Sequence, residues 1–333
     1  MARSSGPAQL VLTGAVARRY YLGGRSQQQI ADELGISRSN ISRMLTAALE
    51  RGIVEIRVHD PSGRDDDLES ALAAAFGLRE ARVAVWAGSA AAADRDDPHP
   101  RVGQLAADLL LETAVDGARL ALSWGRALQA MVAATEPGRE HAVDIVQLVG
   151  GLPSVAHETS GQELLRDLAT RLGARSQHYL HAPAVLSSPA ALQALLTESS
   201  VAQTLQAARE ADVAFVGIGS PEHGSSSRVL DAAVGRRAAA RRRFWAAKPV
   251  GDVASRYFDA EGRAIEGEVD AQVVGVTLAD LRAIPTVVGV ACGQAKLQAV
   301  LGALRGGVLD VLVCDDGLGR ALLEAAGAAD VPA

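Results

Sequence analysis

A short polar stretch near the N-terminus carries side chains that can read bases in DNA. Residues 37–43 read SRSNISR, and at about 100° per residue Ser39 and Arg43 point away from the apolar face that holds Ile41. Arg can bind guanine, Asn can bind adenine, and short hydroxyls can bind either base or phosphate. A solvated polar face on an ordinary helix hairpin is the alternative. The pattern favours base contacts from Ser37, Arg38, Ser39, Asn40, Ser42 and Arg43.

The surrounding residues predict a helix-turn-helix that positions this face. Apolar residues from Ile30 to Met44 fit two short helices separated at Gly35, which tolerates the left-handed turn conformation. Ser26 and Gln29 have the spacing of a capping box for the first helix, and Ser37 is a suitable N-cap for the second. The second helix is expected to bury Ile41, Met44, Leu45, Ala48 and Leu49.

The rest of the N-terminal region indicates a winged helix-turn-helix over residues 1–59. An apolar stripe on residues 11–20, formed by Val11, Leu12, Ala15, Val16 and Tyr20, predicts a third helix. Residues 53–58, IVEIRV, alternate as a strand does, and Arg51 and Arg57 are expected to contact phosphates. Residues 1–58 hold eight arginines and four acidic residues, although the net charge of the 333-residue chain is −6. A basic head on an acidic body suits a phosphate-binding module.

The remainder of the chain, residues 79–333, predicts a doubly wound, mostly parallel α/β sheet. Six apolar runs are expected as strands and alternate with helical stretches. The runs are 82–86, 118–122, 143–149, 213–218, 286–291 and 309–313, and the helical stretches include 103–115, 126–134, 161–172, 190–210 and 294–305. The polar segment HDPSGRDDD and the helix at 68–76 make residues 60–78 a linker with a candidate dimerisation helix.

Five of the predicted strands end in glycine turns. They are followed by residues such as Ser123-Trp124-Gly125-Arg126, Gly150-Gly151 and Cys292-Gly293. In open α/β sheets ligands lie outside the carboxyl ends of the strands, where backbone amides and helix N-termini can hold an anion. Glycine also ends strands without any ligand. Five such turns, with Arg126 and Lys296 nearby, favour a small polar or anionic ligand.

Composition narrows the class of protein. The chain has no leader-like N-terminus and no apolar run of membrane-spanning length, so we expect a cytoplasmic protein. Cys292 and Cys314 are expected to be small core residues, and the seven histidines form no ligand-spaced cluster, so neither a metal nor a cofactor is expected. A head of this size typically reads a palindromic operator in double-stranded DNA as a homodimer or homotetramer.

Several segments in order resemble the SorC family of bacterial sugar-responsive transcriptional regulators. They are residues 20–58, LALSWGRAL, IVQLVGG, FVGIG, VGDVASRYFDAEG and GQAKLQAVLGALRGG. The resemblance implies a winged head joined to a sugar-binding domain similar to sugar-phosphate isomerases. It also implies a sugar effector that is often phosphorylated.

The resemblance also implies the effector site. Ser123, Gly125 and Arg126 would hold the sugar or its phosphate, Asp252 and Asp259 would line the cleft, and Lys296 would be the cation at its floor. Gln147 and Gly150, from IVQLVGG, would belong to the same site. The family often has a hydroxyl residue at Ala127, Gly-Ala at Lys248-Pro249 and Gly at Cys292, and the lost hydroxyl puts a phosphorylated effector in question. Trp124 is expected in the core, and Asp259 has the alternative role of bracing the turn at Gly262.

Two classes of function remain at this point. The first is a DNA-binding regulator whose operator binding is controlled by a sugar or phosphorylated sugar. The second is a sugar-phosphate isomerase or lyase with an attached head, in which Lys296 forms a Schiff base or an aspartate acts as the base. A base-reading helix and a wing have no use in a metabolic enzyme, so we expect the regulator and no enzyme activity.

Overall fold

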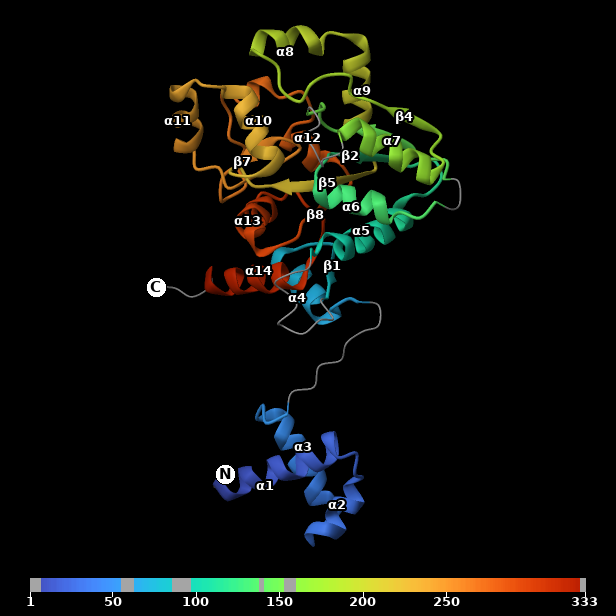
Figure 1. Ribbon diagram of the computed structural model, residues 1–333, viewed down its shortest axis with the longest axis vertical. Coiled ribbons are helices and arrows are strands. Elements are labelled where there is room, and N and C mark those ends of the chain that lie inside the picture. The colour runs from blue at the N-terminus through green and yellow to red at the C-terminus, as the bar shows by residue number, and fades with distance from the viewer. Residues whose placement is uncertain (1–6, 55–62, 86–96, 138–140, 153–159, 330–333) are drawn as a thin grey trace. The chain divides into compact units, whose positions relative to one another are not determined.

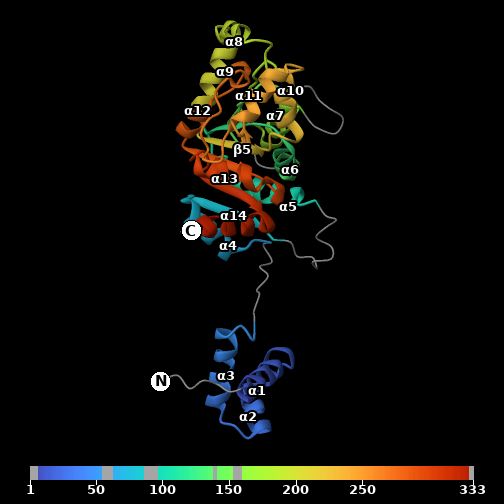
Figure 2. The ribbon, with the colours of Figure 1, turned by 90° about the vertical axis from the view of Figure 1, so that its left-hand side faces the viewer.

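The chain divides into two compact units, Met1–His59 and Asp60–Ala333. The computed structural model describes residues 7–54, 63–85, 97–137, 141–152 and 160–329, and Figures 1 and 2 show both units in two views. Within these residues no helix is long and apolar enough to cross a membrane.

The smaller unit is a set of helices that contains the predicted helix-turn-helix (Figure 1). Its elements are α1 (Pro7–Ala17), the π-helix η1 (Arg18–Leu22), α2 (Gln27–Leu34) and α3 (Arg38–Glu50). The Ser26 hydroxyl accepts from the Gln29 N–H at 3.3 Å and the Gln29 side chain accepts from the Ser26 N–H at 2.9 Å, which confirms the capping box. Gly35 has φ +64°, as the turn requires.

The core of this unit follows the predicted stripe with two exceptions. Val16, Ile30 and Ile41 are fully buried. The predictions for Leu49 and Val11 are wrong: their exposed fractions are 42% and 74%. After Gly52 the chain returns so that Val54, and not Leu49, packs on the cluster, and on α1 it is Leu12 that packs beside Val16. The predicted strand, from residue 55 onward, and Arg57 lie outside the described residues.

The larger unit is built on a sheet of seven parallel strands, which confirms the predicted fold class. All six predicted strands occur, and three short strands were missed. The order is β1-β9-β8-β5-β2-β3-β4, and the antiparallel hairpin β6–β7 extends from the end of β5. The strands are β1 (Glu80–Ala84), β2 (Arg119–Leu122), β3 (Asp144–Gln147), β4 (Ser176–His178), β5 (Val213–Gly219), β6 (Gly251–Val253), β7 (Arg256–Phe258), β8 (Thr286–Val290) and β9 (Val311–Asp315).

Helices cover both faces of this sheet, because its strands alternate apolar side chains between two cores. In β5, Ala214 and Val216 face one core, and Phe215 faces the other. The first core is packed by α4 (Asp66–Phe76), α9 (Ser199–Arg209), α10 (Gly224–Val234), α11 (Ala238–Ala246), α12 (Leu278–Ala283), α13 (Leu297–Arg305) and α14 (Asp316–Ala329). The second is packed by α5 (His99–Thr113), α6 (Arg126–Ala134) and α7 (Gly161–Leu172). The remaining elements are α8 (Pro189–Leu196), η2 (Asp270–Gln272) and η3 (Gln294–Lys296).

The candidate dimerisation helix α4 belongs to the larger unit and packs against β1 and α14. Leu68 and Leu72 are buried, and the buried Glu69 pairs with Arg64 at 2.6 Å while accepting from the Val83 N–H at 2.8 Å. The apolar face of α4 is therefore occupied within the chain. What this helix leaves exposed includes two acidic residues of its first turn.

Candidate functional site

A cavity of about 590 Å³ opens where the strand order of the sheet reverses. From β2 the chain continues to β3 and β4 on one side, and from β5 it continues to β8 and β9 on the other. Helices therefore leave the neighbouring ends of β2 and β5 toward opposite faces of the sheet, which opens a crevice between them. The cavity is lined by residues after β2, β5 and β8 together with the β6–β7 turn.

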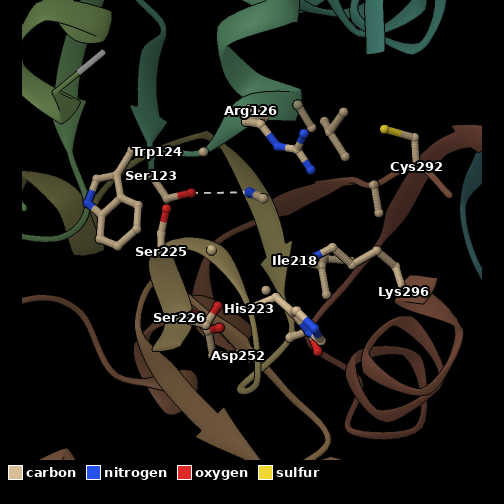
Figure 3. A pocket seen from close by; sticks show the side chains of 18 of the residues that line it. Ser123, Trp124, Arg126, Ile218, His223, Ser225, Ser226, Asp252, Cys292 and Lys296 are labelled. Carbon is tan, nitrogen blue, oxygen red and sulfur yellow. Dashed lines mark hydrogen bonds between the residues drawn. The ribbon is translucent and has the colours of Figure 1, made fainter. Parts of the chain in front are cut away.

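The loop after β2 brings three predicted residues to this cavity: Ser123, Gly125 and Arg126. The Gly217 N–H of β5 donates to the Ser123 hydroxyl at 3.2 Å, which ties the two strand ends together (Figure 3). Gly125 has φ +129°, a conformation that favours glycine, and it precedes the first residue of α6, Arg126. The exposed guanidinium and the free N–H groups of the helix N-terminus make this end of the cavity positive.

Asp252 lines the cavity from β6 and is only 6% exposed. Its Oδ2 accepts from the Ser255 N–H at 3.2 Å, whereas Oδ1 has no hydrogen-bond partner with good geometry in the described residues. Burial raises the pKa of Asp252, and the neighbouring Ser226 hydroxyl and the charge of Lys296 only partly oppose this. The site therefore holds a carboxyl group that is costly to ionise.

Close packing around this carboxyl depends on Gly219, the β5 residue paired with Asp252. A Cβ at Gly219 would lie 2.0 Å from both Asp252 Oδ1 and the Ser226 hydroxyl oxygen. In the turn between β6 and β7, Ala254 and Ser255 have φ +49° and +66°, although neither is glycine. Such conformations cost roughly 1–3 kcal/mol per residue and often occur at ligand sites.

Lys296 reaches the cavity from the loop after β8. Gly293, with φ +87°, makes the turn, and its N–H donates to Asp315 Oδ2 at 2.5 Å. Burial lowers the pKa of Lys296; the negative charge of Asp252 raises it, and Arg126 adds to the lowering. Cys292, beside this turn, also lines the cavity, and burial raises the pKa of its thiol to about 12, so the thiol is neutral.

The structure does not bring Gln147, Gly150 and Asp259 to the cavity. The buried Gln147 side chain donates to the Val149 carbonyl at 2.7 Å and accepts from the Leu180 N–H at 3.2 Å, so it holds backbone groups in place. Gly150 is a close-packing position, where a Cβ would lie 2.5 Å from the Pro183 carbonyl oxygen.

Asp259 braces the turn at Gly262, which was the alternative considered for it. Its Oδ1 accepts from the N–H groups of Glu261 and Arg263 at 3.1 and 3.0 Å, and its Oδ2 accepts from the Arg263 side chain at 2.9 Å. Trp124 is partly buried against both cores and donates to the Gly150 carbonyl at 3.1 Å, but it also lines the cavity.

Sequence reasoning missed the polar segment between β5 and α10. This segment follows the glycine turn 217–219, and its composition, SPEHGSSS, was the signal available for a helix N-terminus with free hydroxyls. His99 and Ser255 were also missed because neither lies in a recognisable motif. The cavity-lining residues in these groups are His99, Ser220, Glu222, His223, Ser225, Ser226 and Ser255.

The candidate DNA-reading face lies on the first turns of α3. Ser37 is the N-cap of this helix, as predicted, and its hydroxyl accepts from the Asn40 N–H at 3.3 Å and lies 3.1 Å from that of Ser39. Burial of Ile41, Met44, Leu45 and Ala48 fixes the opposite face. Asn40 is half-buried, and the exposed polar residues are Ser37, Arg38, Ser39, Ser42 and Arg43, with the exposed Arg51 as C-cap.

Comparisons with known proteins agree with this architecture. Residues 60–324 match the Sugar-bind family, a sugar-binding domain, and residues 15–51 match region 4 of sigma-70. A deoxyribonucleoside regulator from Bacillus subtilis (strain 168) is 31% identical over 307 residues, which cover 92% of this chain and 95% of that protein. A sorbitol operon regulator from Klebsiella pneumoniae is 31% identical over 323 residues, covering 93% and 96%.

The structure of the full-length sorbitol operon regulator SorC from Klebsiella pneumoniae covers 95% of this chain and 99% of its own, with a TM-score of 0.69 and 29% identity. These relatives are transcriptional regulators and not enzymes, so the isomerase or lyase alternative is not supported. The helix-turn-helix and the sugar-binding domain together make a DNA-binding regulator controlled by a sugar. This chain belongs to the SorC family of sugar-responsive transcriptional regulators.

Proposed function

We propose that the cavity at the β2–β5 reversal binds the sugar effector through Ser123, Gly125, Arg126, Asp252 and Lys296. The observation that carries this proposal is the convergence of two cations, a buried carboxyl and two helix N-termini on one cavity. Cations and helix N-termini suit an anionic group, whereas a carboxylate suits hydroxyl donors. A sugar that carries one anionic group, such as a sugar phosphate, has both kinds of group.

The two ends of the cavity give the effector a direction. The anionic group lies against Arg126 and the N-terminus of α6, because this end of the cavity is positive, whereas the carboxyl oxygens of Asp252 at the other end accept hydrogen bonds from hydroxyl groups. Lys296, whose pKa responds to both Arg126 and Asp252, lies where it can contact either part of the effector. With Ala127 supplying no hydroxyl, backbone N–H groups and Arg126 hold the anion.

The α3 face contacts the operator in this proposal. Ser37, Arg38, Ser39, Asn40, Ser42 and Arg43 enter the major groove, and Arg51 and Arg57 bind phosphates. Residues 1–59 are then the DNA-binding domain and 79–333 the effector domain, and of the predicted connection 60–78 the helix α4 packs as part of the effector domain. Two copies in a homodimer, or pairs within a homotetramer, bind the two halves of a palindromic site in the cytoplasm.

A thermal-shift screen tests the effector site. The panel is D-ribose, 2-deoxy-D-ribose, L-sorbose and D-sorbitol, each with its terminal phosphate ester. A ligand present at 100 times its dissociation constant raises the free energy of unfolding by about 2.7 kcal/mol. We expect at least one phosphate ester to raise the unfolding midpoint of the full chain and to shift its affinity for an operator selected from random DNA.

Arg126→Met keeps an aliphatic side chain at the first residue of α6 and removes the charge. The unfolding midpoint of this variant should therefore no longer rise when the phosphate ester is added. Arg166→Met is the matched control, because Arg166 is exposed on α7 and does not line the cavity. If no member of the panel stabilises the wild-type chain, or if both variants keep the rise, the proposed site is wrong.

A further inference from the structure

The region around α11 is strongly basic, although the larger unit is acidic. Six of the thirteen residues 236–248 are Arg or Lys and none is acidic, whereas residues 60–333 as a whole hold 25 basic and 35 acidic residues. In Figures 1 and 2, α11 lies at the outside of this unit, beside α10. A concentrated positive surface on an otherwise negative body is a specific feature that the effector site does not use.

Neighbouring carboxylates neutralise only part of this charge. Glu268 pairs with both Arg237 and Arg243, the latter at 3.0 Å, and Asp231 pairs with Arg241 at 2.5 Å. The other three basic side chains, Arg236, Arg242 and Lys248, are exposed and form no ion pair within the described part of the chain.

The outward face of α11 also has the composition of a protein interface. Ala240 and Phe244 bury the inner face in the core, while Trp245 is a large apolar side chain left 37% exposed. The next two residues, Ala246 and Ala247, are also exposed and have short side chains, so another surface can approach this end of the helix closely. Trp and Arg are the residue types most enriched in the energetic centres of protein interfaces.

A chain of contacts connects this face with the effector cavity. The Trp245 ring packs edge-on against Phe244 at 5.3 Å between centroids, and Phe244 packs edge-on against Tyr257 at 4.8 Å. The buried Tyr257 hydroxyl donates to the backbone carbonyl of Ser226, which lines the cavity next to Asp252. The backbone of Ser226 at the cavity is therefore connected to Trp245 through Tyr257 and Phe244.

We propose that the surface formed by Arg236, Arg242, Trp245 and Lys248 binds an acidic surface of a second copy of this chain, and that the Phe244–Tyr257 contact links this interface to the effector cavity. The inference deepens the proposed function and rests on its homo-oligomer. Charge complementarity favours this partner, because every copy carries the excess of acidic residues. Two α11 surfaces cannot face each other, since like charges across an interface are strongly unfavourable.

The first turn of α4 is a suitable acidic counterpart. Asp66 and Asp67 are exposed there and form no ion pair within the residues that the structure describes. DNA is a less suitable partner for the α11 surface, because its exposed Arg and Lys side chains bind phosphates but the exposed Trp245 has no phosphate to contact. It is nevertheless the competing result that the experiment must separate.

Sedimentation velocity of the full chain at several concentrations and salt levels tests the interface. Wild type should associate, and Arg242→Glu and Trp245→Ala should each weaken association at least about tenfold, as expected for central interface residues. Arg166→Glu makes the same charge change on α7 and should associate like wild type. Adding Asp66→Arg and Asp67→Arg to Arg242→Glu should restore association.

Other results would overturn the interface. A monomeric wild type removes both this inference and the proposed oligomer. If Arg242→Glu associates like wild type, the inference fails while the proposed oligomer stands. If Arg242→Glu instead lowers affinity for random-sequence DNA and leaves association unchanged, the surface binds nucleic acid.

Tyr257→Phe tests the link, since it removes the hydroxyl and keeps the ring. This variant should associate, but association should no longer respond to 2-deoxy-D-ribose 5-phosphate or D-sorbitol 6-phosphate, at least one of which should shift it in wild type. The link is wrong if neither ester shifts wild-type association, or if Tyr257→Phe responds fully.

Discussion

Replacing Asp252 by Asn should make the unliganded protein more stable while it loses its response to sugar. The substitution keeps the size of the side chain and removes its charge. In the wild type Oδ1 is buried without a well-formed hydrogen bond, and Oδ2 accepts from the Ser255 N–H at 3.2 Å. Asn can direct its oxygen to the same N–H and its amide N–H groups to the Ser226 hydroxyl oxygen.

The magnitude follows from the cost of the unpaired oxygen. An unsatisfied buried polar atom costs about 1–3 kcal/mol, and at this chain length each kcal/mol corresponds to a shift of the unfolding midpoint by about 2–4 °C. Removing the negative charge also deprives Lys296 of an attractive partner, which lowers the gain in stability. This loss is small because Lys296 is only half-buried and water in the cavity can solvate it. We therefore expect a gain near the lower end of that range at neutral pH.

The pH dependence gives the sharper assay. Because burial raises the pKa of Asp252, the folded state holds this proton more tightly than the unfolded state does. Stability contributed by this group is therefore present at low pH and is lost as pH rises through the folded-state pKa. The advantage of Asp252→Asn in urea unfolding should accordingly be largest at neutral pH and shrink as the pH falls.

Asp280→Asn is the control with the opposite sign. Burial opposes ionisation of Asp280, but hydrogen bonds from Thr277 and the charge of Arg209 outweigh it and lower the pKa of this carboxyl. Its contribution is present above the unfolded-state pKa and is lost as pH falls through the folded-state pKa. Asp280→Asn should thus destabilise at neutral pH. A less stable Asp252→Asn at neutral pH would refute the reasoning about the buried carboxyl.

Three further predictions concern the proposed contacts. Arg43→Ala should weaken operator binding by about 1–3 kcal/mol and relax one base preference per half-site, as measured by fluorescence anisotropy. Arg57→Ala should instead weaken binding to all DNA sequences alike and reduce the salt dependence of binding. If Arg43→Ala discriminates between sequences as wild type does, the recognition face has been assigned wrongly. Lys296→Met should fold and bind operator but lose about 1.5–3 kcal/mol of effector affinity, the value of a charged hydrogen bond, in calorimetry; borohydride with effector should trap no adduct on Lys296. Residues 60–333 alone should fold and keep the thermal shift with sugar, and an insoluble fragment would argue against a separable body.

The elements that the sequence predicts well are those with a local signal. The cap at Ser26, the turn at Gly35 and the N-cap at Ser37 each depend on residues within one helical turn. Parallel strands buried on both faces produce apolar runs, so the six longer strands were predictable. Residues at the strand ends, including Ser123, Arg126 and Lys296, then follow from the topology of parallel sheets.

Elements that depend on contacts between residues far apart in the sequence are harder to predict. The hairpin strands Gly251–Val253 and Arg256–Phe258 have three residues each, and the turn between them uses Ala and Ser where such a turn favours Gly. Motif similarity could not distinguish Asp252, which faces the cavity, from Asp259, which holds a turn seven residues later. The difference is set by the pairing of Asp252 with Gly219 of β5, a contact across more than thirty residues.

The free energy needed for regulation can be compared with what the cavity supplies. Moving an operator from almost fully occupied to almost fully free requires the effector to favour one state by about 5.5 kcal/mol. In a homodimer with two effector sites, each site must therefore contribute roughly half of this free energy. A ligand hydroxyl that donates to Asp252 Oδ1, which has no well-formed hydrogen bond within the described residues, contributes at most about 1–3 kcal/mol per copy. A contribution of this kind acts as a switch only if the hairpin around Asp252 differs between the two states of the dimer, because a ligand bound equally well by both states shifts nothing. Tyr257 follows Asp252 on that hairpin and leads to α11, so the interface proposed there is where such a difference would have to appear.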